Sequence, residues 1–579
     1  MKRYILTLLL LLLPTAAAAA SLRYEVSGLD GALLQNAKAW LGDAPDTDRE
    51  RQNFIASARK RVASSLRALG YYDPLIEIKV ERTDPQWTLR IAVQPGEPVR
   101  LRNIDLRVTG AASSDAAFNQ LLAEPGFARG DPLHHGHYED LRSRLLALAQ
   151  RRGYFDAEFT DSRVAVDTVG GSADITLHLD SGERYEFGEI VFDETQVSAD
   201  MLDALRTFAR GDAYDQSAVQ NFQASLQRTG FFAAVVVEPL REQAQSGQVP
   251  VAVSLHPAKR HAIDVGVGFS TDTQERLSLT WRTPRINRYG HSQQTRLVLS
   301  QVNPSGRINY QSPLTHPLDD LLSVWARVEE NEFGDLDSQQ RELGTRRELR
   351  TGSLVWGYSL RGLDESWELL DSDQRNDYLL FGASLSTRSI RGSLLDPAGG
   401  LSQLYTVEYG NQDAGSDVDL LRATALLRYV ASPLPQHRVV ARAEFGAAEV
   451  QRGDRDDLAP SLNFFAGGNQ SIRGFGYQSI GNEIEVARAD GSDKRLVVGG
   501  TRLAVLSFEY QYYFNDRWRG AIFTDGGDAF DAGDFDWNVG AGFGLHYVSP
   551  VGAIRVEFAR DVIENDANWR LHLNIGAEF

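Results

Sequence analysis

Residues 569–579 read Trp-Arg-Leu-His-Leu-Asn-Ile-Gly-Ala-Glu-Phe, with an apolar side chain at every second position up to the final Phe579. Successive side chains of a β-strand point to opposite faces, so this period of two predicts a strand with one apolar and one polar face. The same alternation recurs in residues 263–269, 354–360 and 537–547, among others. Strands of ~10 residues with an apolar outer face and a polar inner face are typical of a transmembrane β-barrel.

The length of this alternating region separates a barrel from a soluble β-sandwich, which would show the same pattern. Residues 261–579 continue without a domain break, which is too long for one ordinary sandwich. Segmentation at the turns gives about 16 strands, within the even-numbered range of such barrels. We therefore expect a C-terminal transmembrane antiparallel β-barrel over residues 261–579.

Glycines occur in both strands that would close this barrel. Gly266 and Gly268 lie in the first predicted strand, and Gly576 lies in the last one, three residues before Phe579. Glycine in a strand weakens pairing because it adds backbone freedom and offers no side chain to pack. One interpretation is a weak seam that opens to expose a strand edge for an incoming strand. The other is that these glycines only relieve crowding inside the barrel.

The first half of the chain contains an internal repeat. A helical pattern runs into Gly and two aromatic residues at Gly70-Tyr71-Tyr72, Gly153-Tyr154-Phe155 and Gly230-Phe231-Phe232, and an alternating strand follows. Such a glycine supplies the left-handed turn that ends a helix. Each repeat reads strand, helix, helix, strand, strand, which predicts three small α+β modules. Their expected bounds are residues 21–95, 96–183 and 184–260.

Composition and the N-terminal residues indicate the cellular compartment of the chain. The 579 residues carry 60 Lys+Arg against 78 Asp+Glu, a formal net charge of −18, and no cysteine. Without clustered positive charge, no nucleic-acid partner is expected. The absence of cysteine suits an oxidising compartment and excludes thiol nucleophiles. A basic start, a short apolar run and Ala18-Ala19-Ala20 predict a secretory signal peptide over residues 1–20.

Sequence motifs of common enzymes are missing. The chain lacks Gly-x-Ser-x-Gly, Gly-x-x-x-x-Gly-Lys-[Ser/Thr] and His-Glu-x-x-His. His134, His135 and His137 form a cluster that would suit a metal by residue type, but they stand before a predicted helix, where loop histidines are common. We therefore expect no catalytic, cofactor or metal site, and an enzyme remains the least favoured class.

The alternation lapses between about residues 447 and 500, for longer than a turn requires. Within this segment, residues 464–477 read Phe-Phe-Ala-Gly-Gly-Asn-Gln-Ser-Ile-Arg-Gly-Phe-Gly-Tyr. About 11 predicted strands precede the segment and five follow it. An isolated Arg473-Gly474-Phe475 would be weak evidence, but its place in a long loop late in a barrel makes the tripeptide a candidate functional motif.

These features resemble the BamA/TamA superfamily of outer-membrane assembly proteins, and the three modules resemble its POTRA domains. In that family the sixth loop folds back into the barrel, and its arginine pairs with acidic residues of the inner wall. The resemblance matches Arg473 with Asp525 and Glu509, and the alternation independently points Glu509 inward. We call this expected set of residues 473–475 with the two acids the loop-to-wall lock. Without the lock, the three charged side chains would face water and contribute little to the stability of the barrel.

The resemblance also implies a function. Three modules are similar to the branch of the superfamily that forms the translocation and assembly module, with the barrel in the outer membrane and the modules in the periplasm. It implies a TamB-like inner-membrane-anchored partner, contacted by the N-terminal module, and insertion or secretion of outer-membrane proteins such as autotransporters, with a role in lipid transport. The modules would then capture extended peptides, or merely act as spacers. A two-partner-type secretion pore or passive channel is the alternative.

Overall fold

The computed structural model describes residues 21–45, 47–83, 86–369, 372–393, 396–450, 458–487, 493–549, 552–564 and 568–576. The predicted signal peptide and Phe579 lie outside these residues. The described residues form two compact units, one mainly within residues 21–191 and the other mainly within residues 253–576, with the third module divided between them. Among the described residues, no α-helix has the length and apolar character needed to cross a bilayer.

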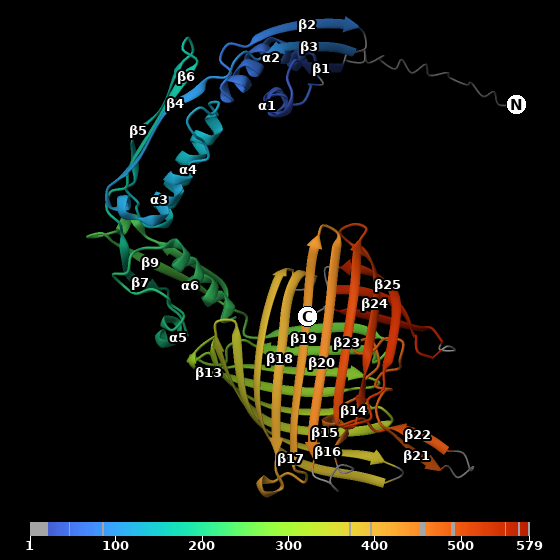
Figure 1. Cartoon of the computed structure of the whole chain (residues 1–579). Helices are drawn as coiled ribbons and strands as arrows, with labels where there is room; N and C mark the ends of the chain where they lie inside the picture. Colours follow the sequence, from blue (N-terminus) through green and yellow to red (C-terminus); the bar gives the residue numbers. More distant parts are fainter. Residues whose placement is uncertain are drawn as a thin grey trace, which may run out of the picture. The chain divides into compact units, whose positions relative to one another are not determined.

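Three small three-stranded sheets occupy the first part of the chain (Figure 1). In the first, β3 (Gln86–Gln94) is central, with β1 (Ser21–Ser27) parallel to it and β2 (Leu75–Thr83) antiparallel. The second sheet repeats this arrangement as β4-β6-β5, and the third has the order β7-β9-β8. The remaining bounds are β4 (Arg100–Thr109), β5 (Glu158–Asp167), β6 (Ser172–Asp180), β7 (Glu186–Phe192), β8 (Phe232–Pro239) and β9 (Gln248–Pro257).

Two helices complete each module. They are α1 (Gly31–Leu41) and α2 (Asp48–Ala68), α3 (Ala116–Ala123) and α4 (His135–Arg151), and α5 (Ala199–Asp203) and α6 (Gln216–Arg228). Helix α2 begins where the Thr47 hydroxyl accepts a hydrogen bond from the Glu50 N–H, a standard N-cap. Its apolar stripe buries Leu66 against Leu89 and Ile91 of the central strand. The order strand, helix, helix, strand, strand agrees with the predicted modules.

Two of the repeated glycines stand where one module meets the next. Gly70 has φ +90°, and a Cβ there would lie 2.5 Å from the Leu133 carbonyl oxygen. Its own carbonyl accepts a hydrogen bond from the Val99 N–H at 2.9 Å. In the same way the Gly153 carbonyl accepts from the Tyr185 N–H at 2.9 Å. Glycine is therefore required here by both the backbone conformation and the close approach of the neighbouring chain.

Sixteen antiparallel strands close into a barrel, in agreement with the predicted fold class. Eleven precede the long loop and five follow it. They are β10 (Ala262–Ser270), β11 (Gln274–Thr283), β12 (Ser292–Ser300), β13 (Ser305–His316), β14 (Asp320–Phe333), β15 (Leu336–Thr351), β16 (Leu354–Leu369), β17 (Ser372–Gly392), β18 (Pro397–Gly410), β19 (Leu420–Leu434), β20 (His437–Val450), β23 (Arg502–Tyr513), β24 (Trp518–Phe530), β25 (Asn538–Ser549), β26 (Gly552–Asp561) and β27 (Arg570–Gly576).

The apolar positions of the alternation lie on the outer surface of the barrel. On β11, Leu277, Leu279 and Trp281 are all exposed. On β23, Leu506 and Phe508 are exposed, whereas the intervening polar residues are buried. A hydrocarbon environment outside and a polar interior explain this distribution, since each strand sorts its side chains by face.

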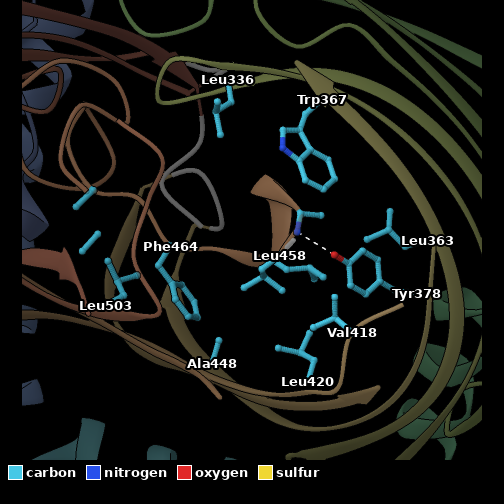
Figure 2. Packing of buried hydrophobic residues seen from close by; sticks show 14 of the residues in the cluster. Leu336, Leu363, Trp367, Tyr378, Val418, Leu420, Ala448, Leu458, Phe464 and Leu503 are labelled. Atoms are coloured by element: carbon cyan, nitrogen blue, oxygen red, sulfur yellow. Dashed lines mark hydrogen bonds between the residues drawn. The ribbon is translucent and has the colours of Figure 1, made fainter. Parts of the chain in front are cut away.

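The described part of the loop between β20 and β23 folds into the barrel and packs on the inner wall (Figure 2). Its residues Leu458 and Phe464 are buried with Trp367 and Tyr378 of the wall. The Ala459 N–H donates a hydrogen bond to the Tyr378 hydroxyl at 2.9 Å. Farther along, β21 (Glu483–Ala487) and β22 (Asp493–Val497) form a separate two-stranded sheet. The apolar contacts of Leu458 and Phe464 hold the first part of the loop against β15–β20.

The glycine at the junction of the first two modules yields a prediction. Gly70→Ala should increase amide hydrogen exchange at Val99, because the added methyl group meets the Leu133 carbonyl and the backbone must move. The expected loss is about 1–3 kcal/mol of local stability. Gly126→Ala is the matched control, since Gly126 has φ +89° with no atom near a Cβ. Equal exchange at Val99 in both variants would contradict the requirement for close approach.

Candidate functional site

Arg473 lies at the tip of the in-folded loop and is 2 % exposed. Its Nε and Nη2 donate to the two carboxylate oxygens of Asp525 on β24 at 2.7 and 2.9 Å. The Arg473 backbone N–H donates to the same carboxylate at 3.0 Å. This is the parallel two-bond geometry for which the planar guanidinium is suited. The loop is thereby fixed to one strand in both its main chain and its side chain.

Two further acids share the same guanidinium. Nη1 of Arg473 donates to Glu509 of β23 at 2.6 Å and to Glu557 of β26 at 3.1 Å. The ring of Phe523 lies against the guanidinium, 3.4 Å from Cζ to the ring centroid. Three strands thus contribute carboxylates to one buried cation. Because an unpaired charge in such a place is very unfavourable, these contacts determine where the loop can rest.

Glycines allow the loop to lie directly on the wall. Gly474 has φ +100°, and a Cβ there would lie 2.7 Å from the carbonyl carbon of Arg560. On the wall, a Cβ at Gly540, which pairs with Asp525, would lie 1.7 Å from the Arg473 carbonyl oxygen. Both positions therefore require glycine. Phe475, the third residue of the motif, packs partly buried against the apolar cluster of the loop.

A wider set of polar residues surrounds the guanidinium. His546 lies 2.9 Å from Glu557, and Arg442 lies 3.8 Å from Asp525. Glu509, His546 and Glu557 have the donor types of a metal site. However, Nη1 of Arg473 already binds both carboxylates, so the positive charge at this place is the guanidinium itself. We therefore interpret the cluster as an ion-pair network.

The three histidines of the second module make local hydrogen bonds and ring contacts. His134 caps α4 by accepting a hydrogen bond from the His137 N–H at 3.3 Å, and the two rings stack with centroids 4.0 Å apart. His135 lies 2.6 Å from the hydroxyl of Tyr72 in the first module. These contacts give each histidine a place in the folded modules.

The predicted seam is the junction of β10 and β27. Among the described residues, these strands pair where Ser270 lies opposite Asn574, whereas β10 pairs with β11 along its whole length. The next residues along the two strands, Phe269 and Ile575, are not paired with each other. We call the part of the seam at Ser270 the distal end, and the part that lies along β10 in the direction of Ala262, where the third module precedes the barrel in the chain, the module end.

The seam glycines differ in their surroundings. A Cβ at Gly266 would lie 2.6 Å from the Ser278 hydroxyl, whereas a Cβ at Gly268 would meet no atom within 4 Å. Gly576 is the last residue of β27, and Phe579 lies outside the described residues. Among the described residues, a Cβ at Gly268 would therefore have open space, whereas one at Gly266 would be close to Ser278.

Several residues of the site were not anticipated from the sequence. Alternation marks Glu557 as inward, because Val556 and Phe558 flank it, so its orientation was accessible. Its proximity to Arg473 depends on the register between β24, β25 and β26, which no single strand reveals. Gly540 carried no signal beyond its place in a strand.

A closed barrel with an inward loop held by a buried arginine, preceded by small α+β modules, defines the class of outer-membrane insertion and secretion barrels. The chain belongs to the Omp85 superfamily, whose domain matches residues 260–579. Residues 23–95 match the POTRA domain described as TamA domain 1. Proteins of this superfamily reside in the outer membrane with their POTRA domains in the periplasm.

The fold is similar to that of a solved BamA structure, and two further solved structures give weaker matches. BamA from Haemophilus ducreyi lacking POTRA domains 1–3 is 16 % identical, with a TM-score of 0.68, over 82 % of this chain and 99 % of that one. CdiB from Acinetobacter baumannii is 15 % identical, with a TM-score of 0.45, over 83 % and 90 %. CdiB from Escherichia coli is 14 % identical, with a TM-score of 0.46, over 91 % and 99 %.

The shared guanidinium predicts a strong coupling between two residues. Arg473→Ala and Asp525→Ala should each destabilise the barrel by about 3–5 kcal/mol, because each leaves a buried charge without its partner. The double variant should be no less stable than either single variant. The measurement is the midpoint of thermal or denaturant unfolding of the purified protein in detergent.

Arg375→Ala is the matched control for this experiment. Arg375 makes the same two-bond contact with Asp364, at 2.9 and 3.0 Å, but its side chain is 62 % exposed. Its loss should change stability by less than about 1 kcal/mol. Additive losses for Arg473 and Asp525, or an effect no larger than that of the control, would show that burial does not couple the pair.

Proposed function

We propose that this chain is the outer-membrane subunit of a translocation and assembly module. In this proposal the barrel lies in the outer membrane of the cell and the three modules lie in the periplasm. The barrel assists the insertion or secretion of outer-membrane proteins such as autotransporters, without a catalytic step of its own. It also has a role in lipid transport within the same envelope.

The observation that carries this proposal is the short pairing between β10 and β27, which among the described residues consists of Ser270 opposite Asn574. Unpaired N–H and C=O groups at a strand edge are a template for another strand. On the outer face of β10, Val265 and Val267 are exposed, as suits contact with lipid or with an apolar strand. A strand arriving from the periplasm would add to this edge by main-chain hydrogen bonds. Opening elsewhere would require long, regular ladders to break.

The loop-to-wall lock supports the same mechanism. Arg473 connects β23, β24 and β26 to the loop, so this part of the wall moves as one body. Movement is then confined to the junction of β10 and β27, which the lock does not connect. We propose that the lock keeps the last strands in register while the seam opens.

The first module offers a surface for a partner. Its sheet leaves β1 and β2 at the edges, and the exposed face of β2 includes Leu75. By the family resemblance, we propose that this module contacts a TamB-like protein anchored in the inner membrane. An extended segment of that protein would pair with an edge strand.

A secretion pore or passive channel is the second candidate. It shares the barrel, but it needs an open path for solute. The apolar cluster formed by Leu458, Leu462 and Phe464 with the wall fills part of the interior and favours assembly over passive flow. Rapid solute flux through the purified barrel would favour the channel.

Reconstitution tests the assembly function. Vesicles containing this protein should insert an unfolded outer-membrane β-barrel substrate faster than empty vesicles, measured as the protease-resistant, heat-modifiable fraction. Arg473→Ala should reduce the rate at least tenfold, whereas Arg375→Ala should leave it unchanged. Insertion no faster than in empty vesicles, together with rapid uptake of a small sugar, would contradict the assembly function.

Site-specific cross-linking tests the partner. A photo-reactive amino acid at Glu81, on edge strand β2, should capture an inner-membrane-anchored protein in cells of the source organism. The same group at Lys60, exposed on α2, is the control because a helix face offers no strand edge. Equal capture from both positions would show that the edge of the sheet is not the binding surface.

A further inference from the structure

Asn469 places its carboxamide between the two strands of the seam. Nδ2 lies 2.9 Å from the Ser270 hydroxyl and 3.2 Å from the Thr271 hydroxyl, both at the distal end of β10. The same nitrogen lies 3.3 Å from the Leu573 carbonyl oxygen of β27. One side chain of the loop therefore contacts both strands. It is also 9 % exposed, so its polar atoms depend on these partners.

His572 of β27 fixes the orientation of this carboxamide. Nε2 of His572 accepts a hydrogen bond from the Gly474 N–H at 3.0 Å. The proton of a neutral ring then lies on Nδ1, which donates to Oδ1 of Asn469. The amide NH₂ of Asn469 is consequently directed towards Leu573 and β10. The histidine thus connects the lock, through Gly474, to the seam.

The main chain of the loop is bound at the same place. The Asn469 N–H donates to the Asp272 carboxylate at 2.7 Å. The preceding Gly468 has φ +99°, and a Cβ there would lie 2.7 Å from that carboxylate. The Thr271 N–H also donates to the Leu573 carbonyl at 3.2 Å. The distal end of the seam is therefore closed by the loop as well as by the strands. We call Asn469 with its partners Ser270, Thr271, His572 and Leu573 the seam clasp.

Beyond the seam clasp the seam is loose. Phe269 and Ile575 are not paired with each other, and a cavity of about 490 Å³ lies at the seam, lined among others by Gly268, Tyr477 and Ile575. Strand residues at this point have space to move inward. The loop itself cannot follow them, because Arg473, four residues after Asn469, is held by three carboxylates.

We propose that Asn469 is a positioning residue that keeps the distal end of the seam closed, so that the seam opens from its module end and an incoming strand enters there. This inference rests on the proposed assembly function, since it specifies how the seam is used. The loop then has two connected tasks: Arg473 fixes its position, and Asn469 transfers that position to the first and last strands.

Disulfide cross-links can test the direction of opening, because the chain has no cysteine of its own. Ser270→Cys with Asn574→Cys closes the distal end. Continuing that register sets Gly268 opposite Gly576, so Gly268→Cys with Gly576→Cys closes the seam towards the module end. Each oxidised protein is compared with its own reduced form in the vesicle insertion assay, with cross-linking verified by gel mobility.

The expected result is asymmetric. The distal cross-link should leave insertion within twofold of the reduced form, and the cross-link towards the module end should reduce it at least tenfold until reductant is added. If both cross-links abolish insertion, the seam is used but the seam clasp does not stay closed, and this inference is overturned. If neither has an effect, the use of the seam in the proposed function is itself refuted.

Hydrogen exchange tests the residue directly. Asn469→Asp keeps the size of the side chain but replaces the NH₂ donor with oxygen, so amide exchange at Thr271 should rise about tenfold. Exchange at Leu571, which pairs with Phe558 across β26 and β27, should stay unchanged, which excludes general destabilisation. Gln470→Ala is the matched control from the same loop. Unchanged exchange at Thr271 in Asn469→Asp would overturn the role of Asn469.

Discussion

The structure of the barrel depends on one buried positive charge. A guanidinium that is almost inaccessible to water is tolerated only where carboxylates replace its hydration, and here Asp525, Glu509 and Glu557 do so from three different strands. The relative height of those strands and the path of the loop are therefore determined together. A shift of register in any of them would separate a charge from its partners, so the arrangement favours a single closed form.

The buried charge also helps to divide the barrel interior into an apolar part and a polar part. Apolar residues of the loop, such as Leu462, pack mainly on strands that precede the loop, together with Leu503 of β23, whereas Arg473 binds acids on strands that follow it. Buried Glu365 accepts hydrogen bonds from the Ser461 N–H at 3.1 Å and the Ser338 hydroxyl at 2.7 Å, joining loop and wall on the apolar side as well. The loop thus binds the wall through both its apolar and its polar residues, whereas the pairing between the described residues of β10 and β27 is short.

Much of this architecture could be predicted from the sequence, because the period of two in the strands and the helical pattern in the repeats are both strong. The period of two identified the barrel, and the prediction of its fold class is confirmed. The pairing of Arg473 with Asp525 came from the family resemblance, while the inward direction of Glu509 followed from alternation. Asn469 and His572 were not predicted, because an isolated polar residue in a loop or strand carries no sign of its partner. Their significance arises from contacts between segments about a hundred residues apart, which only the closed barrel creates.

The order of the loop's contacts along the chain has a consequence for folding. Leu458 and Phe464 pack in one cluster with Tyr378, which precedes the loop, and with Leu503, which follows it. The acids that bind Arg473 all come later in the chain than the loop. The loop therefore gains its full set of contacts only when strands from both sides of it are assembled, so the docking of the loop and the completion of the barrel are coupled.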